Sequence, residues 1–164
     1  MSDSSAEYLT FLLGGEEFGV DILRVQEIMG WSPVTEIPGT PGYLKGVINL
    51  RGLIVPIVDM RQRFGLETAQ YSETTVVIVL RAGGTGDDSL AVGLVVDAVS
   101  EVYKVEHRDI KKAPDFGAAI DSRFIISMAA VDEKLIILLD TQKLLNVNDL
   151  YSVVSQAKPV AAQA

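Results

Sequence analysis

Two aspartates end apolar segments of this chain, and paired carboxylates are what acid/base chemistry uses. Asp59 follows the apolar run 53–58, and Asp140 follows the run 135–139. A small hydrolase would hold both carboxylates in one pocket with perturbed proton affinities. Alternatively, each aspartate accepts hydrogen bonds from the first free N–H groups of a short helix, and Gln62 has the spacing of a capping box with Asp59. We expect helix capping.

The remaining candidates for chemistry lack their partners. His107 is the only histidine, and the chain has no cysteine, so a histidine triad or a multi-histidine metal site is incomplete. The glycine-rich segment 83–86 precedes two aspartates rather than a Lys-Ser/Thr pair, and those carboxylates would repel phosphate. We therefore expect no enzyme activity, no metal site and no cofactor.

Composition narrows the class of protein further. The net charge of −8 opposes binding to nucleic acid, which would need a basic stripe. The first seven residues are polar and acidic, unlike a signal peptide, and no apolar run approaches the ~18 residues of a membrane span. With 164 residues and 48% hydrophobic content, we expect a cytoplasmic protein with one compact domain or two fused halves.

The chain contains an internal repeat. Residues 19–28 return as 93–102 in the frame Gly, two residues, aliphatic, two residues, Val, one residue, Glu, aliphatic. The segments that end at Asp59 and Asp140 form a second matching pair. Because the matches keep their order, a duplicated unit is predicted, with halves near 8–68 and 73–145. Gly19 should then match Gly93, and Asp59 should match Asp140.

The predicted elements are mostly short strands rich in β-branched residues and bounded by Gly, Pro, Asp or Ser. They are 8–13, 34–37, 47–50, 53–58, 74–80, 90–96, 124–131 and 135–139. Short strands at close spacing favour small barrels. Helical spacing of apolar residues predicts a C-terminal helix that ends near 157, with loose tails at 1–7 and 158–164.

The segment 45–59 is the most informative stretch. Its apolar run is broken by Asn49, Arg51 and Gly52, which is the pattern of a tight turn between two buried strands. This turn places Arg51 on a rim, where a guanidinium beside aliphatic surface can anchor a partner carboxylate. The alternative is an arginine that is merely solvated.

From residue 8 to about 153 the sequence resembles the CheW family. The resemblance rests on Gly-Val-Asp-Ile-Leu-Arg-Val-Gln-Glu-Ile, on Lys-Gly-Val-Ile-Asn-Leu-Arg-Gly with the Leu-Ile-Val-Pro-Ile-Val-Asp that follows, on Val-Gly-Leu-Val-Val-Asp-Ala-Val-Ser-Glu-Val, and on the Leu-Ile-Ile-Leu-Leu-Asp strand. It implies a mainly β fold of two packed SH3-like five-stranded barrels with short helices and a C-terminal helix. It also implies a non-enzymatic adaptor that couples the histidine kinase CheA to the cytoplasmic tip of methyl-accepting chemoreceptors, in membrane-associated arrays. The same coupling in a non-flagellar system, such as twitching pili, is the alternative.

The resemblance also implies which residues meet partners. The receptor-facing residues would be Val25, Glu27, Gly46, Arg51, Ile54, Val76 and Val102. The kinase-facing residues would be Lys111 and Phe116, although Phe116 could instead tuck inward from its loop. Lys111 stands where the family often has arginine, so the bidentate geometry is lost there. The hairpin at 83–88 is longer than we expect for the family.

Overall fold

A computed structural model describes residues 5–67, 70–81, 91–112 and 124–141. It contains strands β1 (Ala6–Leu13), β2 (Glu16–Asp21), β3 (Val25–Gly30), β4 (Leu44–Leu50), β5 (Leu53–Asp59), β6 (Val76–Arg81), β7 (Ala91–Val96), β8 (Ala98–Val105), β9 (Ile110–Lys111), β10 (Ile125–Val131) and β11 (Lys134–Leu139), helix α1 (Met60–Arg63), and the 3₁₀ turns η1 (Ile22–Arg24) and η2 (His107–Asp109). The predicted C-terminal helix, the 83–88 hairpin and the 158–164 tail lie outside the described residues.

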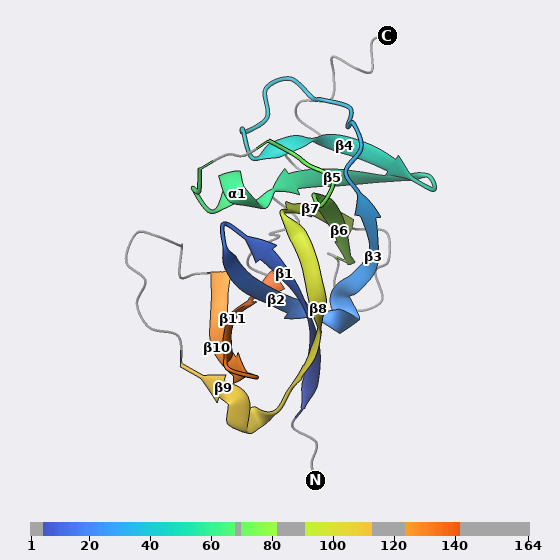
Figure 1. Cartoon of the computed structure of the whole chain (residues 1–164). Coiled ribbons are helices and arrows are strands. Elements are labelled where there is room, and N and C mark those ends of the chain that lie inside the picture. Colours follow the sequence, from blue (N-terminus) through green and yellow to red (C-terminus); the bar gives the residue numbers. More distant parts are fainter. Residues whose placement is uncertain (1–4, 68–69, 82–90, 113–123, 142–164) are drawn as a thin grey trace.

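The strands form two sheets, one above the other in Figure 1. Sheet 1 has the order β8-β1-β2-β11-β10-β9, and sheet 2 has the order β3-β6-β7-β5-β4. The paired strands are antiparallel except for β2 with β11 and β5 with β7, which are parallel. The chain passes from sheet 1 to sheet 2 after β2 and returns after β7.

Each sheet curls into a small barrel around its own core, and we call the barrels of sheet 1 and sheet 2 barrel 1 and barrel 2. Tyr103 of β8 and Ile136 of β11 share one buried cluster, although β1 and β2 lie between their strands in the sheet. In sheet 2, Met29 of β3 packs against the cluster that contains Val55 of β5 in the same way. A third cluster joins the outer faces of both sheets. The predicted pair of barrels with a shared core is therefore confirmed, and β9 adds a short sixth strand to barrel 1.

The register of the strands confirms the internal repeat. Gly19 lies opposite Leu138, and Gly93 lies opposite Ile57, so each glycine faces the residue two positions before a repeat aspartate. A Cβ on either glycine would press on neighbouring side chains, at 3.2 Å from Ile136 for Gly19 and 2.7 Å from Ile57 for Gly93. Both copies therefore need glycine for the same reason, which is close packing in the barrel wall.

The two repeat aspartates also occupy equivalent places. The backbone N–H of Asp59 donates to the carbonyl of Tyr43, and that of Asp140 donates to the carbonyl of Phe124, both at 2.8 Å. Since Tyr43 and Phe124 each precede the first strand of a hairpin, the two hairpins are closed by the same contact. The predicted match between Asp59 and Asp140 is thus confirmed.

The two copies of the repeat exchange strands. Sheet 1 combines β1 and β2 from the first copy with β8 to β11 from the second, while sheet 2 combines β3 to β5 with β6 and β7. The sheets therefore cross the sequence halves 8–68 and 73–145, whose limits stay a prediction. Strand β1 begins at Ala6, which pairs with Val105, so ordered structure starts within the segment expected to be a tail.

One predicted strand is mostly irregular. Within 34–37, Thr35 forms an isolated bridge with Val47, through reciprocal N–H to C=O bonds of 2.9 Å. Pro33 and Pro38 flank this segment and lack the N–H group that further pairing requires. The segment therefore touches the edge strand β4 at one point and then turns away.

Candidate protein interaction site

Asp59 is a helix cap in the structure, as predicted. Its Oδ1 accepts the backbone N–H of Gln62 at 3.2 Å, and its Oδ2 accepts the Tyr71 hydroxyl at 2.5 Å. Burial, and then the hydrogen bond and charge of Asp59, raise the pKa of Tyr71 above its ordinary value. The predicted reciprocal bond of a capping box was wrong, because the Asp59 N–H donates to the carbonyl of Tyr43 rather than to the Gln62 side chain.

The two carboxylates do not come from one sheet. Asp59 ends β5 in barrel 2, whereas Asp140 follows β11 in barrel 1, and the helix that Asp140 would cap lies outside the described residues. No group of three or more His, Cys, Asp or Glu side chains in the described part of the chain could hold a metal ion. The arrangement of Asp59 is structural and does not support the hydrolase alternative.

Six of the seven predicted receptor-facing residues lie in barrel 2, and the seventh lies in barrel 1. Val25 and Glu27 are on β3, Gly46 on β4, Arg51 in the β4–β5 turn, Ile54 on β5, Val76 on β6 and Val102 on β8. The structure thus distributes them over both barrels, and the edge strands β3 and β8 carry three of them.

Arg51 stands on a rigid turn at the rim of barrel 2. It adopts a left-handed φ of 52° and Gly52 one of 90°, while Asn49 Oδ1 accepts the Gly52 N–H at 2.7 Å. The predicted turn, with glycine at an unusual φ and Asn49 as its cap, is confirmed. The Arg51 side chain is 69% exposed and forms an ion pair with Glu27, which ties this turn to β3.

The backbone at position 46 requires glycine for a steric reason. It has a φ of 150°, and a Cβ at this position would lie 2.3 Å from the carbonyl oxygen of Thr35. Gly46 is buried, and the segment that contains Thr35 crosses over it.

The edge strands β3 and β8 present matching apolar residues at the margin of the shared core. Ile28 lies opposite Ile78, and Val102 lies opposite Leu9. Ile78 and Leu9 are both buried in that core. Ile28 is 44% exposed and Val102 is 47% exposed. The repeat assigns them to the same position, so each barrel offers an equivalent side chain to solvent.

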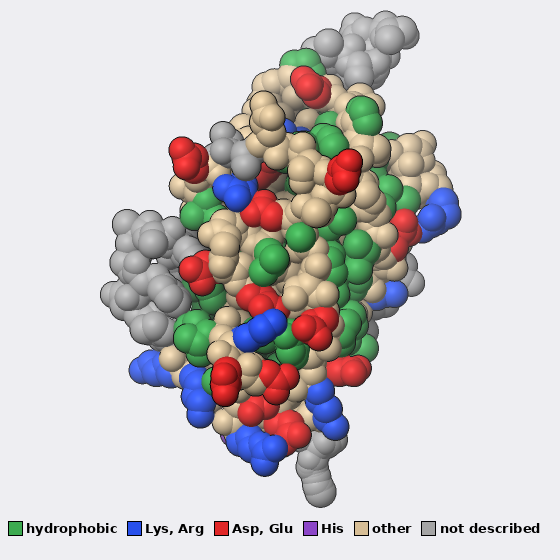
Figure 2. All heavy atoms as spheres, in the orientation of Figure 1, with side chains coloured by type: hydrophobic (Ala, Val, Ile, Leu, Met, Phe, Trp, Pro, Cys, Tyr) green, Lys and Arg blue, Asp and Glu red, His purple; other side chains and the backbone are tan. Residues whose placement is uncertain are grey.

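We call Val25, Ile28, Val99 and Val102 the edge surface. Val25 and Val99, also equivalent in the repeat, are partly buried against the shared core and continue this surface inward. Figure 2 shows hydrophobic side chains gathered in a band over the region where β3 and β8 lie in Figure 1. Ile28 and Val99 were not among the residues predicted from the sequence, although the repeat matches them with Val102 and Val25 and was the signal that could have found them.

The remaining predicted residues differ in how they are placed. Ile54 is 45% exposed on the outer end of β5, whereas Val76 packs against the shared core. Lys111 is exposed on β9, where its Nζ donates to the carbonyl of Arg108 at 3.4 Å. Phe116 lies outside the described residues. On the face in Figure 2, Lys and Arg side chains are interspersed with Asp and Glu.

Comparison with known proteins places these features in a family. The model of the CheW-like domain matches residues 7–149. The chemotaxis protein CheW of Klebsiella aerogenes is 44% identical over 93% of this chain and 89% of its own length. That of Rhizobium meliloti is 38% identical over 85% and 87%.

A solved structure agrees with the sequence comparisons. The crystal structure of the scaffolding protein CheW from Thermoanaerobacter tengcongensis superposes with a TM-score of 0.77 at 34% identity, covering 87% of this chain and 94% of that one. The chain belongs to the CheW-like domain family. No helix in the described residues is long and apolar enough to cross a membrane.

Proposed function

We propose that this chain is a non-enzymatic scaffolding adaptor of chemotaxis that couples a CheA-type histidine kinase to methyl-accepting chemoreceptors. The names of its relatives support chemotaxis and scaffolding, and they favour chemotaxis over an adaptor for pili. The observation that carries the proposal is the edge surface, in which apolar side chains occupy equivalent positions of two edge strands. Asp59, the carboxylate considered for acid/base chemistry, caps a helix instead.

The receptor is proposed to dock where both barrels meet. The apolar face of an amphipathic helix can pack on the edge surface, since Ile28 and Val102 lie at the margin of one buried core and are partly exposed. Arg51 and Glu27 would supply the polar rim, with Ile54 beside them. Val76 and Gly46 would support the edge surface from below. A rim of charges around an apolar centre is the usual anatomy of protein interfaces.

The kinase is proposed to bind elsewhere on the chain, at Lys111 and Phe116. Lys111 lies on β9, which is at the edge of sheet 1 opposite to β8. Separate surfaces would let one adaptor hold both partners at the same time. We further propose that the protein is cytoplasmic and is recruited to membrane-associated receptor arrays through these contacts.

Reconstitution tests this function. Kinase autophosphorylation is measured with receptor cytoplasmic fragments, with and without the purified chain, together with binding of the chain to the receptor fragment and to the kinase regulatory domain. We expect the chain to bind both and to make kinase activity depend on the receptor. Absence of binding to either partner, or nucleotide hydrolysis that fractionates with this chain alone, would refute the proposal.

A further inference from the structure

The second connection between the sheets is a single residue, Asp97, which lies between β7 in sheet 2 and β8 in sheet 1. Strand β8 then carries Val99 and Val102, half of the edge surface. The position of Asp97 therefore affects where this half lies relative to β3.

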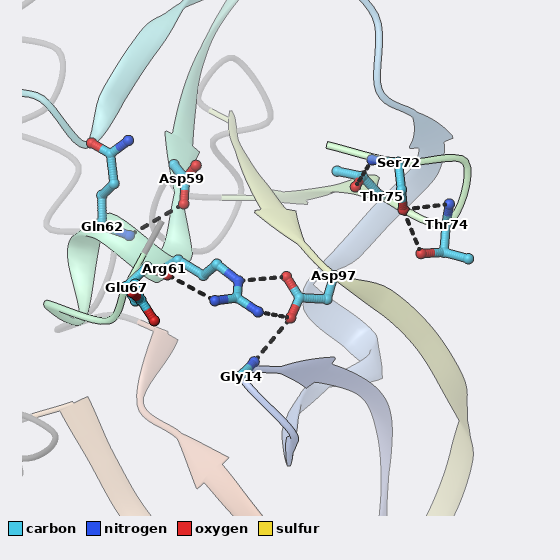
Figure 3. A network of polar contacts seen from close by, with 9 residues as sticks. All are labelled: Gly14, Asp59, Arg61, Gln62, Glu67, Ser72, Thr74, Thr75 and Asp97. Carbon is cyan, nitrogen blue, oxygen red and sulfur yellow. Dashed lines mark hydrogen bonds and ion pairs between the residues drawn. The ribbon is translucent and has the colours of Figure 1, made fainter. Parts of the chain in front are cut away.

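One carboxylate at this connection joins both barrels. Arg61 of α1 donates from Nε to Asp97 Oδ1 at 2.9 Å and from Nη2 to Oδ2 at 2.8 Å. The N–H of Gly14, in the β1–β2 turn of barrel 1, donates to the same Oδ2 at 2.9 Å. Figure 3 shows Arg61 and Gly14 converging on this side chain. Arg61 is itself held by the carbonyl of Glu67, at 2.7 Å from Nη1.

The geometry and partial burial of the pair favour a fixed arrangement. Arg61 and Asp97 side chains are 22% and 33% exposed, and a bidentate fork restricts orientation more than a point charge does. Desolvation alone would raise the pKa of Asp97, but the bonds from Arg61 and Gly14 and the Arg61 charge outweigh it and lower that pKa. The hydrogen bond to Asp97 raises the pKa of Arg61.

The same short helix contacts barrel 1 in other ways. The Arg63 guanidinium lies 4.7 Å from the ring centre of Phe124, which leads into β10, and 4.8 Å from that of Tyr43 in barrel 2. Phe64, which ends α1, stacks on Phe18 of β2 at 5.6 Å between ring centres. The Arg61–Asp97 pair thus belongs to a set of contacts that hold the barrels together near α1.

The other connection between the sheets has no carboxylate at the position equivalent to Asp97. In the repeat, Leu23 occupies the position equivalent to Asp97, at the other passage between the sheets. There, Asp21 accepts the N–H of Leu23 at 2.9 Å, and Arg81 donates to its carbonyl at 2.9 Å. The carboxylate that binds Arg61 is therefore present at only one of the two equivalent positions of the repeat.

We propose that Arg61 and Asp97 are positioning residues of the partner site, which fix the angle between the barrels and thereby the spacing of β3 and β8. Arg61 belongs to α1, which lies on the opposite side of Figure 1 from β3, and Asp97 lies between β7 and β8, outside the four residues of the edge surface. This inference rests on the proposed function for its second half, the effect on binding.

A distance measurement tests the first half independently of any partner. Because the chain has no cysteine, Ser32→Cys and Lys104→Cys give one exposed labelling site beyond β3 and one on β8. Pulsed electron resonance between two nitroxides should show a single narrow distance in the parent chain. Asp97→Asn and Arg61→Gln should broaden or shift it, and the milder Arg61→Lys covers the case in which these variants fold poorly.

A control separates positioning from general stability. Ile136→Val removes a methyl group from the core of barrel 1 and should lower the melting temperature while leaving the distance unchanged. An unaltered distance distribution in Asp97→Asn and Arg61→Gln overturns the inference.

Binding of a receptor cytoplasmic fragment tests the second half, at a temperature where every variant is folded. We expect about fivefold weaker binding for Asp97→Asn, the size of change typical of residues that couple to a site without contacting it. Ile136→Val should bind like the parent chain. Parent-like affinity of a variant with a broadened distance refutes the link to the site. No binding by the parent chain would count against the proposed function, while the distance data would still decide the first half.

Discussion

At the scale of single residues, Arg51 is held in a defined position by its own neighbours. The left-handed backbone of the turn and the Asn49 hydrogen bond fix where its side chain begins, and the ion pair with Glu27 limits where it ends. This ordering reduces the entropy that a partner's carboxylate would have to overcome. Since the guanidinium has five N–H donors, it can hold Glu27 and still offer donors to a partner.

Arg51→Ala should therefore separate binding from stability. The ion pair is exposed, so its loss should change the free energy of unfolding by about 0.5 kcal/mol or less. An anchoring arginine can cost about 2 kcal/mol of affinity when truncated. Melting curves and titration of a receptor fragment measure the two effects. Arg108→Ala, which removes an 81% exposed arginine paired with Glu106, is the matched control and should change neither. Unchanged receptor affinity in Arg51→Ala would remove it from the site.

Gly46 should behave differently, because its constraint is in the backbone. In Gly46→Ala the new Cβ would meet the Thr35 carbonyl at 2.3 Å with φ at 150°, so strand β4 or the crossing segment must move. We expect a loss of about 2 kcal/mol or more in the free energy of unfolding, measured by urea denaturation. Gly15→Ala has a φ of 87° but open space around it, so it should cost only about 1 kcal/mol. Equal losses in the two variants would contradict a steric role.

At the scale of elements, the sequence predicted strands well where apolar residues were dense and poorly where pairing depended on distant partners. The run 53–58 lies within β5 almost unchanged. The segment 34–37 has strand-like residues, and although the flanking Pro33 and Pro38 argue against a long strand, they do not show that Thr35 is the residue that meets β4. The strand exchange was equally hidden, since a repeat shows which segments are equivalent but not which copies pair. The Arg61–Asp97 contact spans 36 residues and had no local signal.

The Arg61–Asp97 pair also predicts how stability depends on pH. Because the pKa of Asp97 is lower in the folded chain than the ordinary value of 3.8, folding favours its ionised form. Its contribution is complete above that ordinary pKa and is lost as pH falls through the lower folded-state pKa. The melting temperature of Asp97→Asn should thus lie below that of the parent chain at pH 7, with a gap that narrows below about pH 4. A gap that stays constant down to pH 3 would show that the charge contributes nothing.

At the scale of the whole molecule, pseudo-symmetry explains why the edge surface is shared. Equivalent strands β3 and β8 bring Ile28 and Val102 to the margins of one core, while α1 fastens the barrels beside Asp97. Because the edge surface is made from both barrels, its shape depends on the position of each barrel. The affinity of a partner that covers the edge surface should therefore depend on how the two barrels are arranged.

This organisation predicts that damage to either barrel's edge affects the same partner. Ile28→Asp and Val102→Asp each place a charge on a partly exposed apolar position, which should leave the fold intact because neither side chain fills the core. Each should weaken receptor binding by about tenfold, or 1.4 kcal/mol, since a carboxylate would be desolvated under the partner. The double variant should lose less than the product of the two, because residues under one partner couple. Ile126→Asp, on β10 and 59% exposed, is the matched control and should bind normally. If only one edge variant weakens binding, the receptor contacts one barrel and the shared surface is wrong.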